Sequence, residues 1–372
     1  MNTYSRTGDK RTSIGILTMH DEERHFRGNL FNFIDLIRTG KELGAKVCVV
    51  AAKDIKIGKP RIKSFTYNAA TKAWIQKMTP LPNVIYNRIP SRKDELQPEV
   101  QQTIQACMKH NKIHLFNPSF FDKWTLFGWL NKAKATKKYI PVTRMLTQFN
   151  ELEAMLLRYG LVYLKPASGK AGRGIMKIEL TTSDPPYRLH IQHKQKSLIF
   201  GYRSIADLGA RIRQRIGSED YIVQQGIYLA KYQNRAFDLR VLVQKNAQGL
   251  WSLTGIGARI AGDFSITTHV PRGGSIDEPQ KLLNITFGHK VGRRIMRRVK
   301  LTSYAIAKQI EKAAKHPMGE MSLDLGVDTA GQIWFFEANS RPMKFDEPEI
   351  RKKSLERIIQ YSDYLTHSRK KK

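Results

Sequence analysis

The most constraining feature of this chain is a short segment near its carboxyl end, GQIWFFEANSRPM, residues 331–343. Four consecutive apolar residues, Ile333 to Phe336, predict a fully buried strand. Glu337 and Asn339 follow directly, and residues two apart on a strand point to the same face. A fold that contains this segment must bury a strand and still present two oxygen-bearing side chains at its end.

The preceding residues predict the partner strand of a hairpin. A turn at residues 328–331 reverses the chain, so that Asp324 can reach the same end as Glu337 and Asn339. Three oxygen ligands without His or Cys suit Mg²⁺ or Mn²⁺, and Mg²⁺ takes one or two carboxylates while substrate phosphates and water complete its coordination. A hairpin whose acids only face solvent is the alternative. It explains the turn but not an acid and an amide at the end of so apolar a strand.

A second segment, residues 160–180, supplies cations and glycines that suit a polyphosphate. It predicts two strands, the first ending at Lys165. The loop between them holds a serine and three glycines, which let backbone N–H groups approach an anion: Ser168, Gly169, Gly172 and Gly174. With Lys123 and Arg259 they would form a cationic cradle for phosphate oxygens. Taken alone, the loop is weak evidence and is more typical of a plain flexible hairpin, because hairpins with several glycines are common and GxGxxG or Walker spacing is absent.

The apolar periodicity divides the chain into sections. Residues 13–55 predict a β-α-β unit, and a long helix is predicted over residues 295–315. The fold class is therefore α/β followed by α+β. Four sections are predicted. A basic amino-terminal segment covers residues 1–12 and an open α/β layer residues 13–117. A larger section with the candidate site covers residues 118–345, and a basic helical tail covers residues 346–372. The tail could cap the core, pack on a partner or keep the protein soluble, in that order of preference.

The charge balance predicts an acidic partner. Lys and Arg number 64 against 32 Asp and Glu, a formal net charge of +32, with the basic residues densest at 292–300 and 368–372. Such a field attracts nucleotides, anionic substrates, nucleic acid or acidic polymers without choosing among them. Charge runs are usually solvated faces, so a dedicated nucleic-acid function is not favoured.

Other classes are excluded by composition. Cys48 and Cys107 are isolated among apolar residues, which indicates buried side chains rather than a disulfide or metal site. No run of about 18 apolar residues is present to span a bilayer, and the polar, basic amino terminus does not resemble a signal peptide. We therefore expect a protein that is cytoplasmic at synthesis and has no membrane span.

The ordered motifs resemble those of the ATP-grasp superfamily. They are DKW with IPVT, VYLKPASGKAGRGI, YIVQQGI, FDLRVLV, ARI with RGGS, LDLGVD and FFEANSRP, and they cover about residues 118–345. With YNRIPSR before them, the whole chain looks most like the YheC/YheD family of endospore coat-associated proteins. The resemblance implies an ATP-grasp fold, in which two α+β subdomains clasp ATP behind a Rossmann-like domain that contributes to the acceptor site.

The resemblance also implies roles for individual residues. Lys123 and Lys165 would contact phosphates and adenine, and residues 169–174 would close over the triphosphate. The hinge that reads the adenine edge would be formed by Gln224, Gln225 and Ile227. Asp238 would hold the nucleotide. Arg240 and Arg259 would face phosphate or acyl phosphate. The metal ligands would be Asp324, Glu337 and Asn339. Two departures are Gly226, where a bulkier residue is common, and His269, where related ligases usually carry Asn.

The implied activity is an ATP- and Mg²⁺-dependent ligase that activates a carboxylate as an acyl phosphate for attack by an amine or thiol. Charge and positioning would supply catalysis, because no Ser-His-Asp or Cys-His pattern is present. Expected partners are ATP, an unidentified acidic small molecule or peptide acceptor, and spore coat proteins, with Arg341 and Lys344 contributing to acceptor choice. The alternatives are a non-catalytic ATP-binding coat protein and a basic protein that binds nucleic acid or an acidic polymer.

Overall fold

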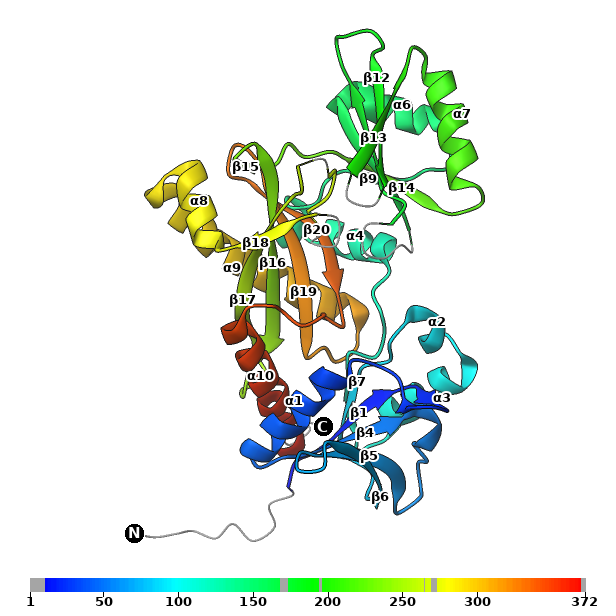
Figure 1. The fold of residues 1–372 in the computed structure, drawn as a ribbon, viewed down its shortest axis with the longest axis vertical. Helices are drawn as coiled ribbons and strands as arrows, with labels where there is room; N and C mark the ends of the chain where they lie inside the picture. The colour runs from blue at the N-terminus through cyan, green and yellow to red at the C-terminus, as the bar shows by residue number, and fades with distance from the viewer. Residues whose placement is uncertain (1–10, 168–172, 194–195, 264, 269–272, 369–372) are drawn as a thin grey trace.

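The computed structural model describes residues 11–167, 173–193, 196–263, 265–268 and 273–368. They form three six-stranded sheets along the long axis of the molecule, and the sheet that comes third in the chain lies between the other two (Figure 1). A two-stranded ribbon, β2 (His20–Asp21) with β3 (His25–Phe26), lies beside the first sheet. The combination confirms the predicted α/β plus α+β class.

The first sheet has the strand order β6-β5-β4-β1-β7-β8. Its strands are β1 (Ser13–Thr18), β4 (Lys46–Ala51), β5 (Ile62–Asn68), β6 (Ala73–Thr79), β7 (Val84–Asn87) and β8 (His114–Phe116). β1 is parallel to β4 and β7, and β7 to β8. The helical elements are α1 (Leu30–Glu42), η1 (Ala52–Asp54), α2 (Arg92–Glu95) and α3 (Pro98–Lys109). α1 packs on one face and α3 on the other, whereas the antiparallel hairpin β5-β6 was not predicted.

The second sheet is antiparallel throughout, in the order β13-β12-β11-β10-β14-β9. Its strands are β9 (Thr143–Met145), β10 (Leu161–Pro166), β11 (Met176–Leu180), β12 (Tyr187–His193), β13 (Lys196–Tyr202) and β14 (Tyr221–Gln225). Two helices pack on it, α6 (Phe149–Tyr159) and α7 (Ile205–Ile216). The predicted loop between Lys165 and the next strand thus joins β10 to β11.

The third sheet has the order β18-β17-β16-β19-β20, with β15 paired to β16. Its strands are β15 (Lys231–Tyr232), β16 (Arg235–Lys245), β17 (Trp251–Ile260), β18 (Ser275–Asp277), β19 (Glu320–Val327) and β20 (Ile333–Asn339). Apolar side chains of one face pack against α4 (Lys123–Asn131), α8 (Pro279–Phe287) and α9 (His289–Ala314); α5 (Lys134–Lys137) follows α4. In the turn before β20, Asp328 Oδ1 accepts the N–H groups of Ala330 and Gln332.

α9 begins earlier than its sequence predicted. The structure starts it at His289, directly after Gly288 ends α8, instead of at Ile295. The basic run at residues 292–300 therefore lies on the helix, with Gly292 tightly packed against α8, where a Cβ would approach Asn284 Oδ1 to 2.5 Å.

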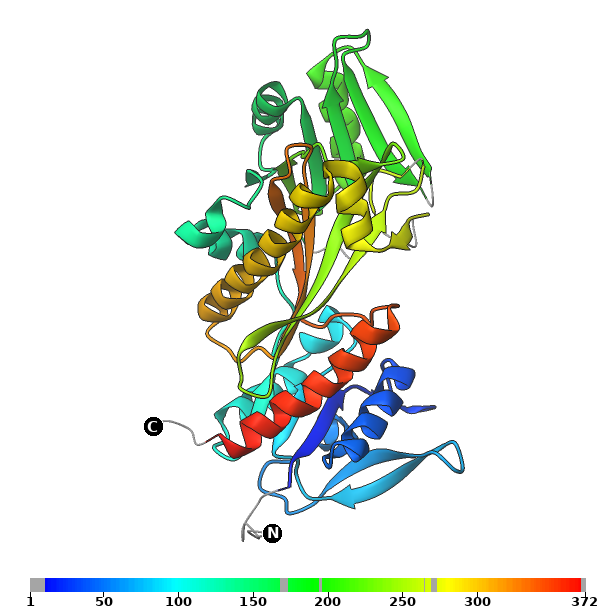
Figure 2. The same cartoon turned by 90° about the vertical axis from the view of Figure 1, so that its left-hand side faces the viewer.

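The predicted tail forms α10 (Pro348–His367), which crosses from the third sheet to the first (Figure 2). Ile358, Ile359 and Tyr361 are buried with the core of the first sheet. At its other end Ile350 packs on β17, where a Cβ on Gly255 would lie 2.4 Å from the Ile350 side chain. Of the three suggested roles, these contacts match capping of the core.

Candidate functional site

The side chains of the candidate site lie on one face of the third sheet. Strand pairing places Arg240, Asp324 and Glu337 in one row across β16, β19 and β20. Asp238 and Arg259 lie opposite each other in the next row. The intervening residues of β16, Phe237, Leu239 and Val241, are buried on the opposite face. Period-two alternation therefore separates the core from the site.

A bulge in β20 turns the predicted metal ligands onto the site face. Asp324 pairs with Glu337 but Leu325 pairs with Phe335, so Phe336 is an extra residue in β20. Without the bulge Glu337 would share the core-facing side of Phe335. The expectation of a fully buried strand was thus wrong in part: Phe335 is fully buried, whereas Trp334 and Phe336 are half-buried. β20 has one face in the core and one toward the site.

Asp324, Glu337 and Asn339 fit the chemistry of a magnesium site. Asn339 pairs with Ser322, two residues along from the Asp324–Glu337 pair, so two carboxylates and an amide lie on the same face of two neighbouring strands. All donors are oxygens, which Mg²⁺ prefers. Among the described residues no group of three or more His, Cys, Asp or Glu could hold a metal, so phosphate and water oxygens would have to complete the coordination. The assignment stays a prediction.

Arg259 joins the two rows through carboxylates. Its Nη2 lies 2.7 Å from Asp238 Oδ2 and 2.9 Å from Asp324 Oδ2, and all three side chains are buried. Burial acts to lower the pKa of Arg259, but the charges of Asp324 and Asp238 outweigh it and raise the pKa. Thr268 Oγ1 also donates to Asp238 at 2.6 Å. Arg259 was expected to face phosphate; here its guanidinium holds the two carboxylates in place.

Two lysines reach the same place from different parts of the chain. Lys123, at the start of α4, has Nζ 3.8 Å from Glu337 Oε2. Lys165, at the end of β10 in the second sheet, donates to Gln224 Oε1 at 2.6 Å and lies over the Phe336 ring. Burial and the Lys123 charge lower the pKa of Lys165 to about 8, although Glu337 and Asp324 oppose this. Lys123 and Lys165 thus lie beside the predicted metal ligands, an arrangement that suits an anion site.

Comparison with known proteins identifies the family of this chain. The family model described as YheC/D like ATP-grasp matches residues 112–365. The chain belongs to this ATP-grasp family. The endospore coat-associated protein YheD of Bacillus subtilis (strain 168) is 29% identical over 353 residues, which cover 92% of this chain and 76% of YheD. YheC of the same strain is 21% identical over 320 residues, covering 83% of this chain and 84% of YheC.

Solved structures support the fold. The D-alanyl-alanine synthetase A of Vibrio cholerae O1 biovar eltor str. N16961 is similar with a TM-score of 0.56 and 16% identity, covering 96% of this chain and 99% of that one. The VanG D-Ala:D-Ser ligase of Enterococcus faecalis has a TM-score of 0.52 and 13% identity, with coverage of 95% and 100%. At these identities the likeness establishes the ATP-grasp fold alone. In the described part of the chain, no helix is both long and apolar enough to cross a membrane.

The ATP-grasp hinge expected at Gln224, Gln225 and Ile227 lies at the end of β14. The Gln225 side chain and N–H both bond to Val142, and Gln224 Nε2 donates to Thr143 Oγ1 at 2.9 Å. Within the described residues the half-buried Ile227 uses no backbone hydrogen bond, so its polar groups remain available to an adenine edge. Gly226 is required by packing, because a Cβ would lie 2.1 Å from Leu161 Cγ.

Only the end of the predicted phosphate loop can be placed. Gly174 has φ +74°, and a Cβ there would lie 2.7 Å from Pro166 Cγ and from Tyr221 Oη, so both conformation and space demand glycine. Tyr221 donates to the Gly174 carbonyl at 3.1 Å. The other loop positions, Ser168, Gly169 and Gly172, and also His269, lie outside the described residues.

Arg240 borders the site on the side of the first domain. Its guanidinium lies over the Phe345 ring at 5.0 Å, and its buried Nε has no hydrogen-bond partner among the described residues. Near Phe345 a narrow cleft with about 30 Å³ of space, room for about one water molecule, lies between the first domain, α10 and the segment after β20. Lys344 lines this cleft, and its predicted part in acceptor choice stays a prediction.

Arg341 does not face the cleft as predicted for acceptor choice. It is 8% exposed, donates to Ile89 O at 3.0 Å and to Glu95, and lies over the Phe120 ring. Burial lowers the pKa of Arg341 to about 10, although Glu95 opposes this. It therefore ties the end of β20 to the first domain.

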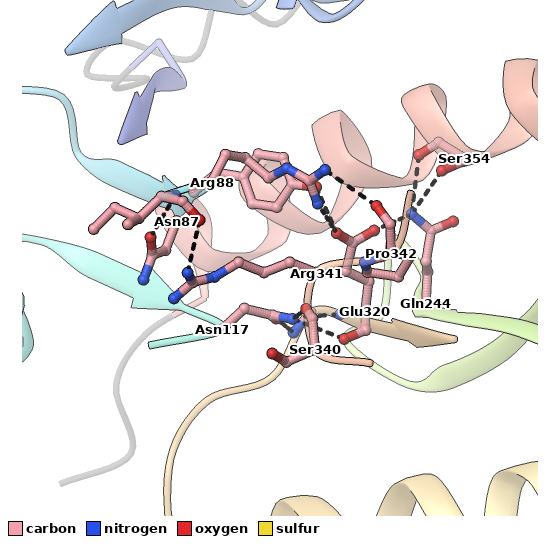
Figure 3. A network of polar contacts seen from close by, with 12 residues as sticks. Asn87, Arg88, Asn117, Gln244, Glu320, Ser340, Arg341, Pro342 and Ser354 are labelled. Carbon is pink, nitrogen blue, oxygen red and sulfur yellow. Dashed lines mark hydrogen bonds and ion pairs between the residues drawn. The ribbon is translucent and has the colours of Figure 1, made fainter. Parts of the chain in front are cut away.

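A buried polar network beside Arg341 was not predicted (Figure 3). Glu320 accepts from Tyr86 Oη at 2.5 Å and from Gln244 Nε2 at 3.1 Å, with Arg88 Nη1 at 3.4 Å. Asn117 Nδ2 donates to the carbonyls of Glu320 and Ser340. The YNRIPSR motif contains Arg88, so this motif was the available signal for an arginine between the domains. The network fixes the segment that follows Asn339.

Proposed function

We propose that this protein is an ATP- and Mg²⁺-dependent ligase that joins a carboxylate to an amine or a thiol. The observation that carries the proposal is the row of Arg240, Asp324 and Glu337, which Lys123 and Lys165 approach from the two sides of the ATP-grasp fold. Mn²⁺ could replace Mg²⁺ in the same oxygen set.

In this reaction an acceptor carboxylate oxygen attacks the γ-phosphorus of ATP and the bond to the β-phosphate oxygen breaks, so ADP leaves and an acyl phosphate forms. The amine or thiol then attacks the carbonyl carbon, loses a proton to solvent and displaces phosphate. Bound Mg²⁺ would neutralise charge on the phosphates and would be held by Asp324, Glu337 and Asn339. Lys123 and Lys165 would bind phosphate oxygens, and Arg240 would stabilise charge on the transferring group.

The acceptor would lie in the cleft beside Arg240. The cleft is lined by Lys344, by Arg88 and Arg351, which pair with Glu320 and Asp35, and by the apolar side chains of Leu36, Met343 and Phe345. A small acid or an acidic peptide end with an apolar body would match this lining in chemistry, and the cleft of about 30 Å³ would have to widen to admit it. The acceptor would then have its carboxylate next to Arg240, whose unpartnered Nε can donate to it.

A second candidate is a spore coat protein that binds ATP without turning it over. It is favoured by the names of the relatives YheD and YheC and by the high net charge. In this case coat proteins would be the partners, and the protein would act after leaving the cytoplasm of its synthesis. The two candidates differ in one measurable property, ADP release that depends on an acceptor.

The test compares the wild type with the double variant Glu337→Ala, Asn339→Ala. ADP release is measured with ATP, Mg²⁺ and a panel of amino acids, peptides and spore metabolites, and nucleotide binding is measured by calorimetry. We expect acceptor-stimulated release in the wild type and its loss in the double variant, while the exposed control Glu42→Ala retains it. Unchanged turnover in the double variant refutes the site, and nucleotide binding without stimulated release supports the coat-protein alternative.

A further inference from the structure

α9 presents a long basic face that the proposed ligase activity does not use. Its 26 residues span about 39 Å, and one side is buried in the core of the third sheet. The other side is exposed and carries the following cations: Lys290, Arg293, Arg294, Arg297, Arg298, Lys300, Lys308 and Lys312. We call this set the α9 ridge. Figure 2 shows α9 on the outer side of the sheet.

The α9 ridge works against the stability of its own helix. Neighbours three and four residues apart, such as Lys290 with Arg294 and Arg293 with Arg297, carry like charges, which repel. The first turn of α9 contains no acidic residue, and its N-cap, Gly288, offers no side-chain hydrogen bond. The cations near this end therefore lie, without compensation, at the positive end of the helix dipole, where positive charge is unfavourable. Such departures from local rules are expected where a surface serves a function.

The fold does not neutralise the α9 ridge from neighbouring elements. Within the described residues none of its cations forms an ion pair with a carboxylate. The acid on the helix, Glu311, is occupied by Lys245 at 2.5 Å and by Trp251 Nε1 at 2.8 Å. On the neighbouring α10, burial and then the charges of Arg357 and of Lys300 from the ridge lower the pKa of Lys353, although Glu356 opposes this. The α9 ridge is therefore open to an anionic partner.

We propose that the α9 ridge is a docking surface for an acidic polypeptide segment. Guanidinium groups bind carboxylates through paired hydrogen bonds, and the ridge follows one side of a straight helix. Leu301, 57% exposed, lies within the ridge, four residues after Arg297 and seven before Lys308. An acidic peptide can place an apolar side chain on Leu301, whereas a phosphate backbone offers no apolar group there.

The ridge is separate from the candidate active site. α9 packs on the face of the third sheet that carries Leu239 and Val241, and the site occupies the opposite face. Docking would therefore hold an acidic protein on the enzyme without entering the catalytic cleft. The inference does not depend on the proposed ligase activity and can be tested without ATP.

The experiment uses the full chain and fluorescence anisotropy with three labelled probes: a 20-residue peptide of Glu and Leu, an all-Glu peptide of equal length, and a 20-base-pair DNA duplex. The triple variant Arg293→Gln, Arg294→Gln, Arg297→Gln is compared with the control Lys53→Gln, Lys56→Gln, Lys59→Gln, which removes three exposed charges from the first domain. At about 0.1 M salt each lost pair weakens binding roughly twofold, so we expect the ridge variant to bind the Glu and Leu peptide about tenfold more weakly.

The control should lose less than about threefold, and the all-Glu peptide should bind the wild type more weakly than the mixed peptide. In a charge-conserving variant, Arg293→Lys, Arg294→Lys, Arg297→Lys, the affinity for the Glu and Leu peptide should remain within a few-fold of the wild-type affinity. This variant shows whether substitution at these three positions disturbs the fold and so weakens binding. Equal losses in the ridge and control variants would mean diffuse attraction by net charge and would overturn the proposal. A ridge-specific loss for the duplex alone would replace it with nucleic-acid binding.

Discussion

ATP affinity should fall as pH rises through about 8, because Lys165 loses its proton there. Burial and the charge of Lys123 lower the pKa of Lys165 from 10.5 to about 8. Between pH 7 and pH 9.5 the protonated fraction falls from about nine-tenths to about one-thirtieth, so binding that requires the ammonium group weakens about 30-fold, or about 2 kcal/mol. Cys48 and Cys107 do not titrate in this window, because burial raises the pKa of each to about 11.

The free energy of unfolding should change in the opposite sense. Below pH 8 Lys165 is charged in both the folded and the unfolded chain, and its burial is unfavourable to folding. Between pH 8 and pH 10.5 the unfolded chain binds the extra proton, so the contribution to stability rises with pH, by about 2 kcal/mol at most between pH 8 and 9.5. Urea unfolding at matched ionic strength measures this change.

The variant Lys165→Arg provides the control, since a guanidinium stays charged throughout this range. Calorimetry with a non-hydrolysable ATP analogue should give a pH-dependent affinity for the wild type and a nearly constant one for the variant. If both proteins lose affinity in parallel between pH 7 and 9.5, another group titrates and the role assigned to the Lys165 charge is wrong.

Three further substitutions test packing, the network and α9. Gly226→Ala should destabilise the protein by about 1–3 kcal/mol in urea unfolding, because there is no room for the added Cβ. The control Gly128→Ala adds a Cβ in open space on α4 and should stabilise the protein by up to about 1 kcal/mol. Equal effects of the two substitutions would contradict the packing account. Tyr86→Phe should cost about 1–3 kcal/mol by the same measurement, since buried Glu320 loses a donor, and an unchanged midpoint would argue against that bond. Lys290→Glu should raise the thermal midpoint at low salt by removing repulsion at the start of α9, and a lower midpoint would refute this.

The sequence predicted the position of the candidate site because its signals are local. Alternation on β16, the turn at Asp328 and the spacing of Glu337 and Asn339 are read within a few residues. Pairing then brought Asp324 opposite Glu337, as the hairpin predicted. The bulge at Phe336 was beyond reach, because four apolar residues in a row do not reveal which of them is the extra one.

Long-range contacts explain the remaining errors. Arg341 follows the site directly, yet its partners are Glu95 and the Pro118 carbonyl, more than 200 residues earlier in the chain. The sequence alone does not contain the arrangement of domains that decides such cases.

The face of the third sheet that carries the candidate site also forms the junction with the first domain. Along β16 the polar residues Asp238 and Arg240 belong to the site, and Gln244, on the same face, belongs to the network around Glu320. The backbone that positions the predicted metal ligands is thus clamped at one end by buried hydrogen bonds. Because a site acts through geometry held by its supporting contacts, the network is the part of the fold that would keep the acceptor cleft aligned with Arg240.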